Sequence, residues 1–227
     1  MKDSIKYCHL SVDDVGESLR RLASATNATN GLFDIAFFNT IKKWHERFGI
    51  KITLYCYALA NDFIISEIPS CYRRDFVQNA SWLKFGYHAK CAKPFIEETG
   101  YKAGFNLFND TIKRLGAGKT NTLRLHYWQA NPEQKKFLRS KGVRTLLTKD
   151  DDSLPYNEND IFQSEGLMHR RTRIRFENID TVITPEVLQI GNKYIVAFTH
   201  EWCFDKEAEK IERALQLYSE HGYKFIA

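Results

Sequence analysis

Apolar and polar residues follow two alternating patterns along this chain of 227 residues. One pattern marks segments with the composition of β-strands, and several of these are apolar on both faces, as expected for strands covered by helices. The predicted strands are Lys6–Val15, Lys51–Ala58, Ser81–Ala89, Asn121–Trp128, Gly142–Thr148, Thr172–Ile179 and Lys193–Trp202.

The second pattern predicts helices between most of these strands. Apolar residues recur every three or four positions in the segments 37–48 and 101–115, and a glycine follows each segment. Asn131 and Pro132 are typical of an N-cap and a first helical turn, and the segment Lys206–His221 is amphipathic. Alternating strands and helices predict an α/β fold with a parallel sheet, either open or closed into a barrel.

The composition is that of a globular protein, with 43% hydrophobic, 27% charged and 14% aromatic residues. It excludes a disordered or low-complexity chain. We find neither an internal repeat nor a Ser/Gly/Pro-rich linker, so we expect one domain over residues 1–227, with a long polar loop at Lys149–Asp160. A net charge of +5 does not require a nucleic-acid partner.

The ends of the chain and the cysteines bear on location. The first ten residues contain no apolar region typical of a secretory signal, and the longest apolar stretch, 52–60, is far short of the roughly 20 residues of a membrane span. The five cysteines are odd in number and form no C-x-x-C pair. We therefore expect free thiols, no zinc ribbon and a cytoplasmic location.

Polar residues gather where four of the predicted strands end. In parallel α/β folds the carboxyl ends of the strands meet at one edge and carry the chemistry. Carboxylates and imidazoles bind zinc and similar divalent ions, and a further carboxylate or histidine can serve as base or acid. Taken singly, such residues are also common as helix caps or as hydrogen-bonded structural histidines. The residues are Asp13 and Asp14, His88, Arg124 and His126, and His200.

The segments that contain these residues resemble, in the same order along the chain, the sequence motifs of a known protein family. His9–Val15 is similar to a first motif Thr/Ser-Phe-Asp-Asp-Gly, and 44–55 is similar to a helix end followed by a second strand. Phe85–His88 resembles an Ile-Gly-Asn-His stretch, and Val196–His200 resembles a strand that ends in Leu-x-His. From Lys6 to Trp202 the chain thus resembles the polysaccharide deacetylases (NodB homology domain, carbohydrate esterase family 4).

The resemblance implies a distorted seven-stranded (β/α) barrel and a metal-dependent hydrolase. Such an enzyme removes an N-acetyl group from a sugar, and we expect a role in surface-polysaccharide biosynthesis. By the same resemblance Asp13 is the catalytic base, Arg124 orients it, Asp14 and His88 bind the metal, and His200 is the acid.

The third metal ligand departs from the family pattern. The second motif has two histidines four residues apart, but Ala92 stands where the second is expected. His126 is the first candidate to replace it, because Arg124, His126 and Trp128 alternate onto one face of a strand, and Cys91 is the second. Zinc is the expected ion, with cobalt, nickel or manganese as alternatives.

Aromatic residues next to these positions suggest a carbohydrate-binding rim. Tyr87, Trp128 and Trp202 are the candidates, although Trp202 also suits core packing. Because Ala92 replaces an expected ligand, an alternative hypothesis is a non-catalytic member of the family that only binds a sugar chain. A third possibility is a polyanion-binding strand, since Arg171, Arg173 and Arg175 would share one face. The oligomeric state is left open.

Overall fold

The fold is described from a computed structural model. It describes residues 5–24, 31–60, 62–92, 100–128, 130–149, 161–179 and 182–227. Cys8, Cys56, Cys71 and Cys203 carry free thiols, as expected. Of the loop expected at Lys149–Asp160, residues 150–160 lie outside the described residues.

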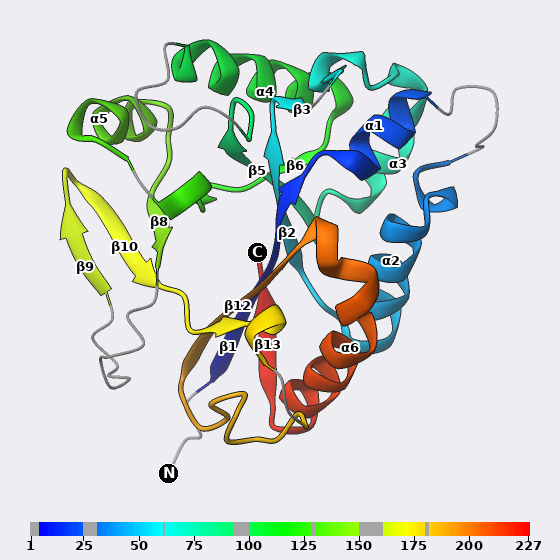
Figure 1. Ribbon diagram of the computed structural model, residues 1–227, viewed down its shortest axis with the longest axis vertical. Helices are drawn as coiled ribbons and strands as arrows, with labels where there is room; N and C mark the ends of the chain where they lie inside the picture. The colour runs from blue at the N-terminus through cyan, green and yellow to red at the C-terminus, as the bar shows by residue number, and fades with distance from the viewer. Residues whose placement is uncertain are drawn as a thin grey trace.

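A parallel sheet forms the centre of the molecule (Figure 1). Strand β1 pairs with β12 on one side, and on the other with β13 along its first half and β2 along its second half. Pairing continues from β2 to β5 and β6, and from β12 to β11, in parallel throughout. The strands are β1 (Lys6–Val15), β2 (Ile52–Tyr57), β5 (Leu83–Ala89), β6 (Gly118–Lys119), β11 (Ile174–Arg175), β12 (Tyr194–His200) and β13 (Tyr223–Ile226).

A second sheet continues the strand order of the first. Its order is β7-β8-β10-β9, with β7, β8 and β10 parallel and β9 antiparallel. The chain passes directly from β6 to β7 and from β10 to β11, so the strands follow one another in a ring that is interrupted at these two places. This order matches the predicted α/β fold of distorted-barrel type. The strands are β7 (Thr122–Leu123), β8 (Thr145–Thr148), β9 (Ile161–Ser164) and β10 (Leu167–Arg171), and a separate hairpin joins β3 (Leu59–Ala60) and β4 (Phe63–Ile64).

Helices cover the outside of the strands. Helices α2 and α6 lie side by side at the right of Figure 1, where the rings of Phe37 and Phe204 are 4.7 Å apart and the Trp44 indole donates to Glu212. The Gly49 cap in the left-handed conformation ends α2, as its position predicts. The helices are α1 (Glu17–Ser24), α2 (Ala36–Phe48), α3 (Arg73–Asn79), α4 (Tyr101–Leu115), α5 (Pro132–Ser140) and α6 (Phe204–Glu220).

Strand β1 shows how the interior differs from the helix-covered face. Cys8, Leu10 and Val12 form one apolar buried face. The alternate residues His9, Ser11 and Asp13 form a second face that is also buried but polar. The ring of strands therefore encloses polar side chains, and these lead toward the carboxyl end of β1.

Several predicted strands are shorter than expected. Asn121–Trp128 contains β7 and then a 3₁₀ turn, η4 (His126–Trp128), in which Tyr127 and Trp128 are left-handed. Thr172–Ile179 contains β11 followed by a second 3₁₀ turn, η5 (Phe176–Asn178). The chain between β10 and β11 interrupts the arginine-rich segment, so its arginines do not lie along one strand. The turns η4 and η5 therefore place irregular backbone after the carboxyl ends of β7 and β11.

Candidate metal and catalytic site

A β-bulge places two carboxylates at the end of β1. Val12 pairs with Leu54 and Val15 with Cys56, so β1 has one residue more than β2 over this interval. In a regular strand Asp13 and Asp14 would point to opposite faces. Asp14 instead adopts the left-handed conformation, with φ 58°, which turns its side chain toward the neighbouring strand ends.

His88 also lies at an irregularity of the sheet. Cys56 and Tyr57 of β2 pair with Tyr87 and Ala89 of β5, which leaves His88 as the extra residue. Its ring is 4% exposed, and its Nδ1–H donates to the backbone carbonyl of Arg124 over 2.6 Å. This bond fixes the tautomer and presents the lone pair of Nε2 to the site, as expected for a metal-binding histidine.

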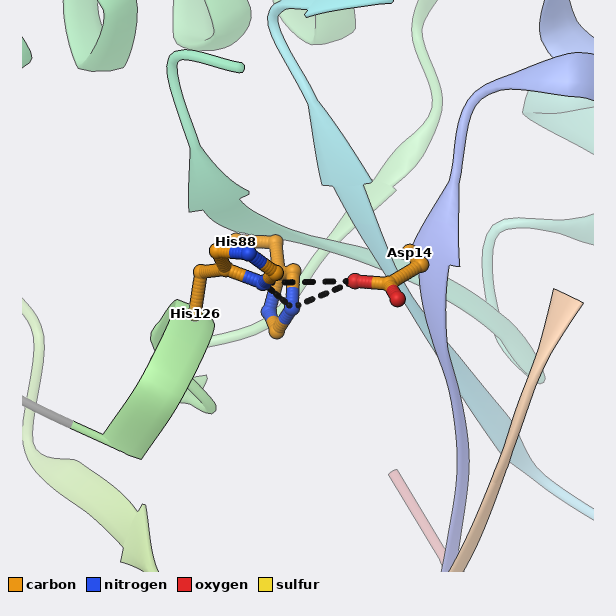
Figure 2. A group of neighbouring side chains, drawn as sticks. All are labelled: Asp14, His88 and His126. Atoms are coloured by element: carbon orange, nitrogen blue, oxygen red, sulfur yellow. Dashed lines mark hydrogen bonds and ion pairs between the residues drawn. The ribbon is translucent and has the colours of Figure 1, made fainter. Parts of the chain in front are cut away.

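His126 reaches the same point from turn η4. His88 Nε2 lies 3.1 Å from Asp14 Oδ1 and 3.2 Å from His126 Nδ1, and the last two atoms are 3.4 Å apart. Figure 2 shows the three side chains converging from different segments. Three ligands of a tetrahedral ion with bonds of about 2.0–2.2 Å lie about 3.3–3.6 Å apart, close to the three separations here. The donor types and spacing therefore fit a divalent metal ion.

Further residues hold the Asp14 carboxylate in place. The Tyr57 hydroxyl donates to Oδ1 over 2.5 Å, and the Trp202 indole donates to Oδ2 over 3.1 Å. Burial raises the pKa of Asp14, but hydrogen bonds with His126, His88 and Tyr57 outweigh it and hold the pKa far below its usual range. Asp14 is thus ionised at neutral pH, as a metal ligand must be.

Asp13 and Arg124 form a buried ion pair next to this cluster. Asp13 is 2% exposed and Arg124 is fully buried, and Arg124 Nη1 lies 3.0 Å from Asp13 Oδ1. The guanidinium also donates to Ser11 Oγ and Thr172 Oγ1, and it packs over the ring of Phe198 at 4.1 Å. Arg124 therefore fixes the position of the Asp13 carboxylate, the role that the resemblance implies.

His200 forms a second dyad, with Glu177. Asp13 and His200 are paired across β1 and β12, so they lie on adjacent strand ends. Glu177 Oε1 lies 2.5 Å from His200 Nδ1 and also accepts hydrogen bonds from the His200 backbone N–H and the Cys203 thiol. The carboxylate orients the imidazole so that its Nε2 can carry a proton to or from a substrate.

A cavity of about 940 Å³ opens beside the donor cluster, and its volume is within the range usual for ligand sites. Asp14, Tyr57 and Trp202 line it, and so do Cys91 and Ala92. The position that lacks the family's second histidine therefore faces the site. His126 occupies the donor cluster in its place, and among the described residues Cys91 is not a member of that cluster.

The predicted aromatic rim is partly wrong. Tyr87 is 3% exposed and packs edge-on against Phe105 and Phe108 of α4, because it points to the opposite face of β5 from His88. It belongs to the core. Trp202 is 66% exposed and stacks on the ring of His200, so core packing does not account for it. Trp128 lies half-buried over Arg124.

Two residues of the site were not identified from the sequence. Tyr57 lies at the end of β2, and Glu177 lies in η5 directly after β11. Tyr57 and Glu177 lie at or just after the end of a strand, at the same edge as the predicted residues, and this position is the one signal the sequence holds for them. Their partners are 43 and 23 residues away, and only the folded chain brings them together.

The Glu177 dyad predicts a specific pH dependence of stability. Burial raises the pKa of Glu177, but hydrogen bonds from His200 and Cys203 lower it from 4.5 to about 2. Because the folded-state pKa is depressed, the stabilisation is present above pH 4.5 and is lost as the pH falls toward 2. In urea denaturation Glu177→Gln should be less stable than the wild type at pH 7, and this difference should shrink on acidification. The exposed Glu209→Gln should show no such trend; a constant difference for Glu177→Gln would contradict the assignment.

Comparison with known proteins shows which solved structures have a similar fold. No protein-family model matches the chain, and no curated protein matches it. Among solved structures it resembles the Bc1960 peptidoglycan N-acetylglucosamine deacetylase, with 13% identity and a TM-score of 0.60 over 97% of this chain and 85% of that chain. A family 4 carbohydrate esterase from Streptomyces lividans gives 15% identity and a TM-score of 0.52 over 98% and 92%. The chain has the fold of the family 4 carbohydrate esterases.

The carbohydrate esterase fold includes both active and inactive proteins. A third similar structure is BA3943, described as a family 4 pseudoenzyme from Bacillus anthracis, with 10% identity and a TM-score of 0.56 over 97% of this chain and 63% of that chain. The function of a chain with the esterase fold therefore has to be argued from its own site residues. Within the described part of the chain, no helix combines the length and the apolar character that a membrane crossing requires.

Proposed function

We propose that the protein is a metal-dependent hydrolase that removes an N-acetyl group from a carbohydrate. The proposal is based on three groups of side chains that lie together at the carboxyl ends of the strands. These are the donor cluster of Asp14, His88 and His126, the Asp13–Arg124 ion pair and the His200–Glu177 dyad. Together they provide a metal site, a base and an acid, which are the parts that amide hydrolysis needs.

The chain's own residues take distinct parts in the reaction. The donor cluster would hold a divalent ion, which would supply Lewis acidity to the acetyl carbonyl and make a water molecule more acidic. Asp13 accepts the proton of the attacking water, and Arg124 holds the carboxylate at the site. His200, oriented by Glu177, donates a proton to the departing sugar nitrogen. The exposed ring of Trp202 provides a surface on which a sugar ring can stack.

The alternative is a non-catalytic protein that binds sugar chains. It follows from Ala92, which removes one expected ligand. The position of His126 favours the hydrolase, because it restores a third donor atom at metal-binding distance from the other two. Zinc as the resident ion, a cytoplasmic location and a role in surface-polysaccharide biosynthesis remain predictions of the same proposal.

Acetate release tests the proposal directly. The protein, supplied with zinc, cobalt, nickel or manganese, is incubated with N-acetylglucosamine oligosaccharides and with N-acetylglucosamine phosphates, and free acetate is measured. We expect release that stops on addition of a chelator and returns with excess metal. Metal binding without acetate release from any of these N-acetyl sugars would support the non-catalytic alternative instead.

A further inference from the structure

The turn that follows His200 contacts both sides of the proposed active site. It is the 3₁₀ turn η6 (Glu201–Cys203), and two of its residues, Glu201 and Trp202, line the cavity beside the donor cluster. The pairing of β1 with β12 ends at Asp13 and His200. Beyond this pair, side chains of η6 continue the contact between the two strand ends.

Glu201 binds the backbone at the start of helix α1. Its Oε2 accepts hydrogen bonds from the N–H groups of Gly16 and Glu17 over 2.7 and 2.8 Å, and its Oε1 accepts one from Ser18 over 2.7 Å. The first amides of a helix have no partner within the helix and carry partial positive charge, so a carboxylate binds them strongly. Such a cap usually comes from the residue just before the helix. Here it comes from a residue 183 to 185 positions further along the chain.

The capped amides lie just after the metal-ligand candidate Asp14. Asp14 is left-handed, with φ 58°, a conformation that costs a residue other than glycine free energy and persists where surrounding contacts hold it. The chain that leaves Asp14 is fixed at Gly16. Glu201 accepts from the Gly16 N–H, and a Cβ at Gly16 would lie 2.8 Å from the Cβ of Ala60. This fixed exit restricts the backbone of Asp14 and hence the direction of its carboxylate.

Trp202 contacts the side chain of the same aspartate. Its indole N–H donates to Asp14 Oδ2 over 3.1 Å, and its ring stacks on that of His200 with the centroids 5.1 Å apart. Glu201 thus acts on the backbone that follows Asp14, and Trp202 acts on its carboxylate. Since they are the next two residues after His200, they also set where the proposed acid lies relative to Asp14.

We propose that Glu201 and Trp202 are positioning residues, which hold Asp14 in its metal-binding conformation and link it to His200. The inference rests on the proposed function, because that function gives Asp14 and His200 their roles. Neither residue belongs to the donor cluster among the described residues. Their effect on a metal ion therefore passes through Asp14, and their loss should weaken metal binding without removing a ligand.

Glu201→Gln tests the backbone contact. The amide keeps one acceptor oxygen, but its NH₂ group is a donor and would face backbone N–H groups, so at least one of the three hydrogen bonds is lost. Loss of an outer partner of a metal ligand costs about 10–100-fold in affinity, so we expect zinc and cobalt to bind at least about tenfold more weakly. The absorption spectrum of bound Co(II) should also change, since it depends on the ligand geometry.

Trp202→Phe tests the side-chain contact. Phenylalanine keeps an aromatic ring beside His200 but has no N–H to donate to Asp14. We expect metal affinity to fall by about tenfold, the lower end of the same range. Because Trp202 is exposed, this variant keeps the test valid if Glu201→Gln does not fold. Folding of each variant is checked by urea denaturation.

A readout in the metal-free protein makes the test independent of the ion. The NMR chemical shifts of the Asp14 Cα and Cβ report its backbone conformation, and in Glu201→Gln they should move toward those of an extended residue. Asp75→Asn is the matched control, because Asp75 Oδ2 likewise accepts from a distant backbone N–H, that of Leu32, over 2.7 Å. Asp75 lies on α3, which holds none of the described residues of the donor cluster or its cavity, so this variant should leave metal affinity and the Asp14 shifts unchanged.

The outcomes separate this inference from the proposed function. Wild-type metal affinity and Asp14 shifts in the folded variants, or equal changes in Asp75→Asn, would overturn the positioning role, while acetate release would still support the hydrolase. Weaker metal binding in Glu201→Gln without acetate release from the wild type would support the positioning role and reject the hydrolase. If the wild type binds no metal, the proposed function fails, and the Asp14 shifts decide the inference.

Discussion

Asp13→Asn is expected to reduce acetate release by about 10²–10⁴-fold while leaving the metal content unchanged. The substitution removes the proton acceptor but keeps the size of the side chain and one oxygen near Arg124. Asp13 is not a member of the donor cluster, so metal binding should not depend on its charge. The measurement combines initial rates of acetate release with elemental analysis of the same preparation.

The buried ion pair makes a stability control necessary. Without the Asp13 charge, the fully buried Arg124 guanidinium has no carboxylate partner, at a cost of about 3–5 kcal/mol. A domain with a stability of about 5–15 kcal/mol can remain folded after this loss. Ser11→Ala is the matched control, because Ser11 also accepts from Arg124 Nη1 but carries no base. It should retain most of the activity; a folded, metal-loaded Asp13→Asn with wild-type rates would remove Asp13 as the base.

His88→Ala should abolish stable metal binding. The variant lacks the donor atom Nε2, which lies 3.1 Å from Asp14 Oδ1 and 3.2 Å from His126 Nδ1. Since loss of an outer hydrogen-bond partner already costs about 10–100-fold in metal affinity, we expect loss of a direct ligand to cost at least about 100-fold. Metal content after dialysis against a weak chelator, with acetate release measured in parallel, gives the result.

A second histidine provides the control for this experiment. His221 is exposed at the end of α6 and contacts the Leu217 carbonyl, far along the chain from the donor cluster. His221→Ala should bind metal like the wild type. Equal metal content in His88→Ala and His221→Ala would mean that the ion is held elsewhere, and the donor cluster would no longer account for it.

The regular parts of the fold could be predicted because their signals are local. Strand β1 has the predicted bounds, helices α2, α4 and α6 lie within two residues of the segments predicted for them, and α5 begins at the predicted Pro132. The site residues from these strands were predicted as well, because all parallel strands end at one edge. The order of strand and helix was sufficient to place Asp13, Asp14, His88 and His200 together.

What could not be predicted depends on contacts between distant segments. The alternation of Arg124, His126 and Trp128 along one strand was the reason for choosing His126, yet the chain there turns into η4. His126 reaches the donor cluster because Tyr127 and Trp128 adopt left-handed conformations, stabilised by packing of Trp128 on Phe198 and Arg124. The prediction of the residue is consistent with the structure, but its structural reason was wrong.

Two short strands, β10 and β13, were not predicted from the sequence. Strand β10 pairs with both β8 and β9, although its sequence, Leu-Met-His-Arg-Arg, is mostly polar. Strand β13 follows α6 after one tight turn at Gly222, which is left-handed, and pairs with the start of β1. Both strands are stabilised by pairing with neighbours that are remote in sequence, which a local pattern does not reveal.

Anomalous scattering from crystals grown with zinc or cobalt is the most direct test of the metal site on which the account depends. We predict a peak about 2.0–2.2 Å from Asp14 Oδ1, His88 Nε2 and His126 Nδ1. The described residues contain a second donor cluster, Glu177, His200 and Cys203, to which we assign proton transfer rather than metal binding. No peak at the first cluster, or a peak at the second alone, would contradict the account.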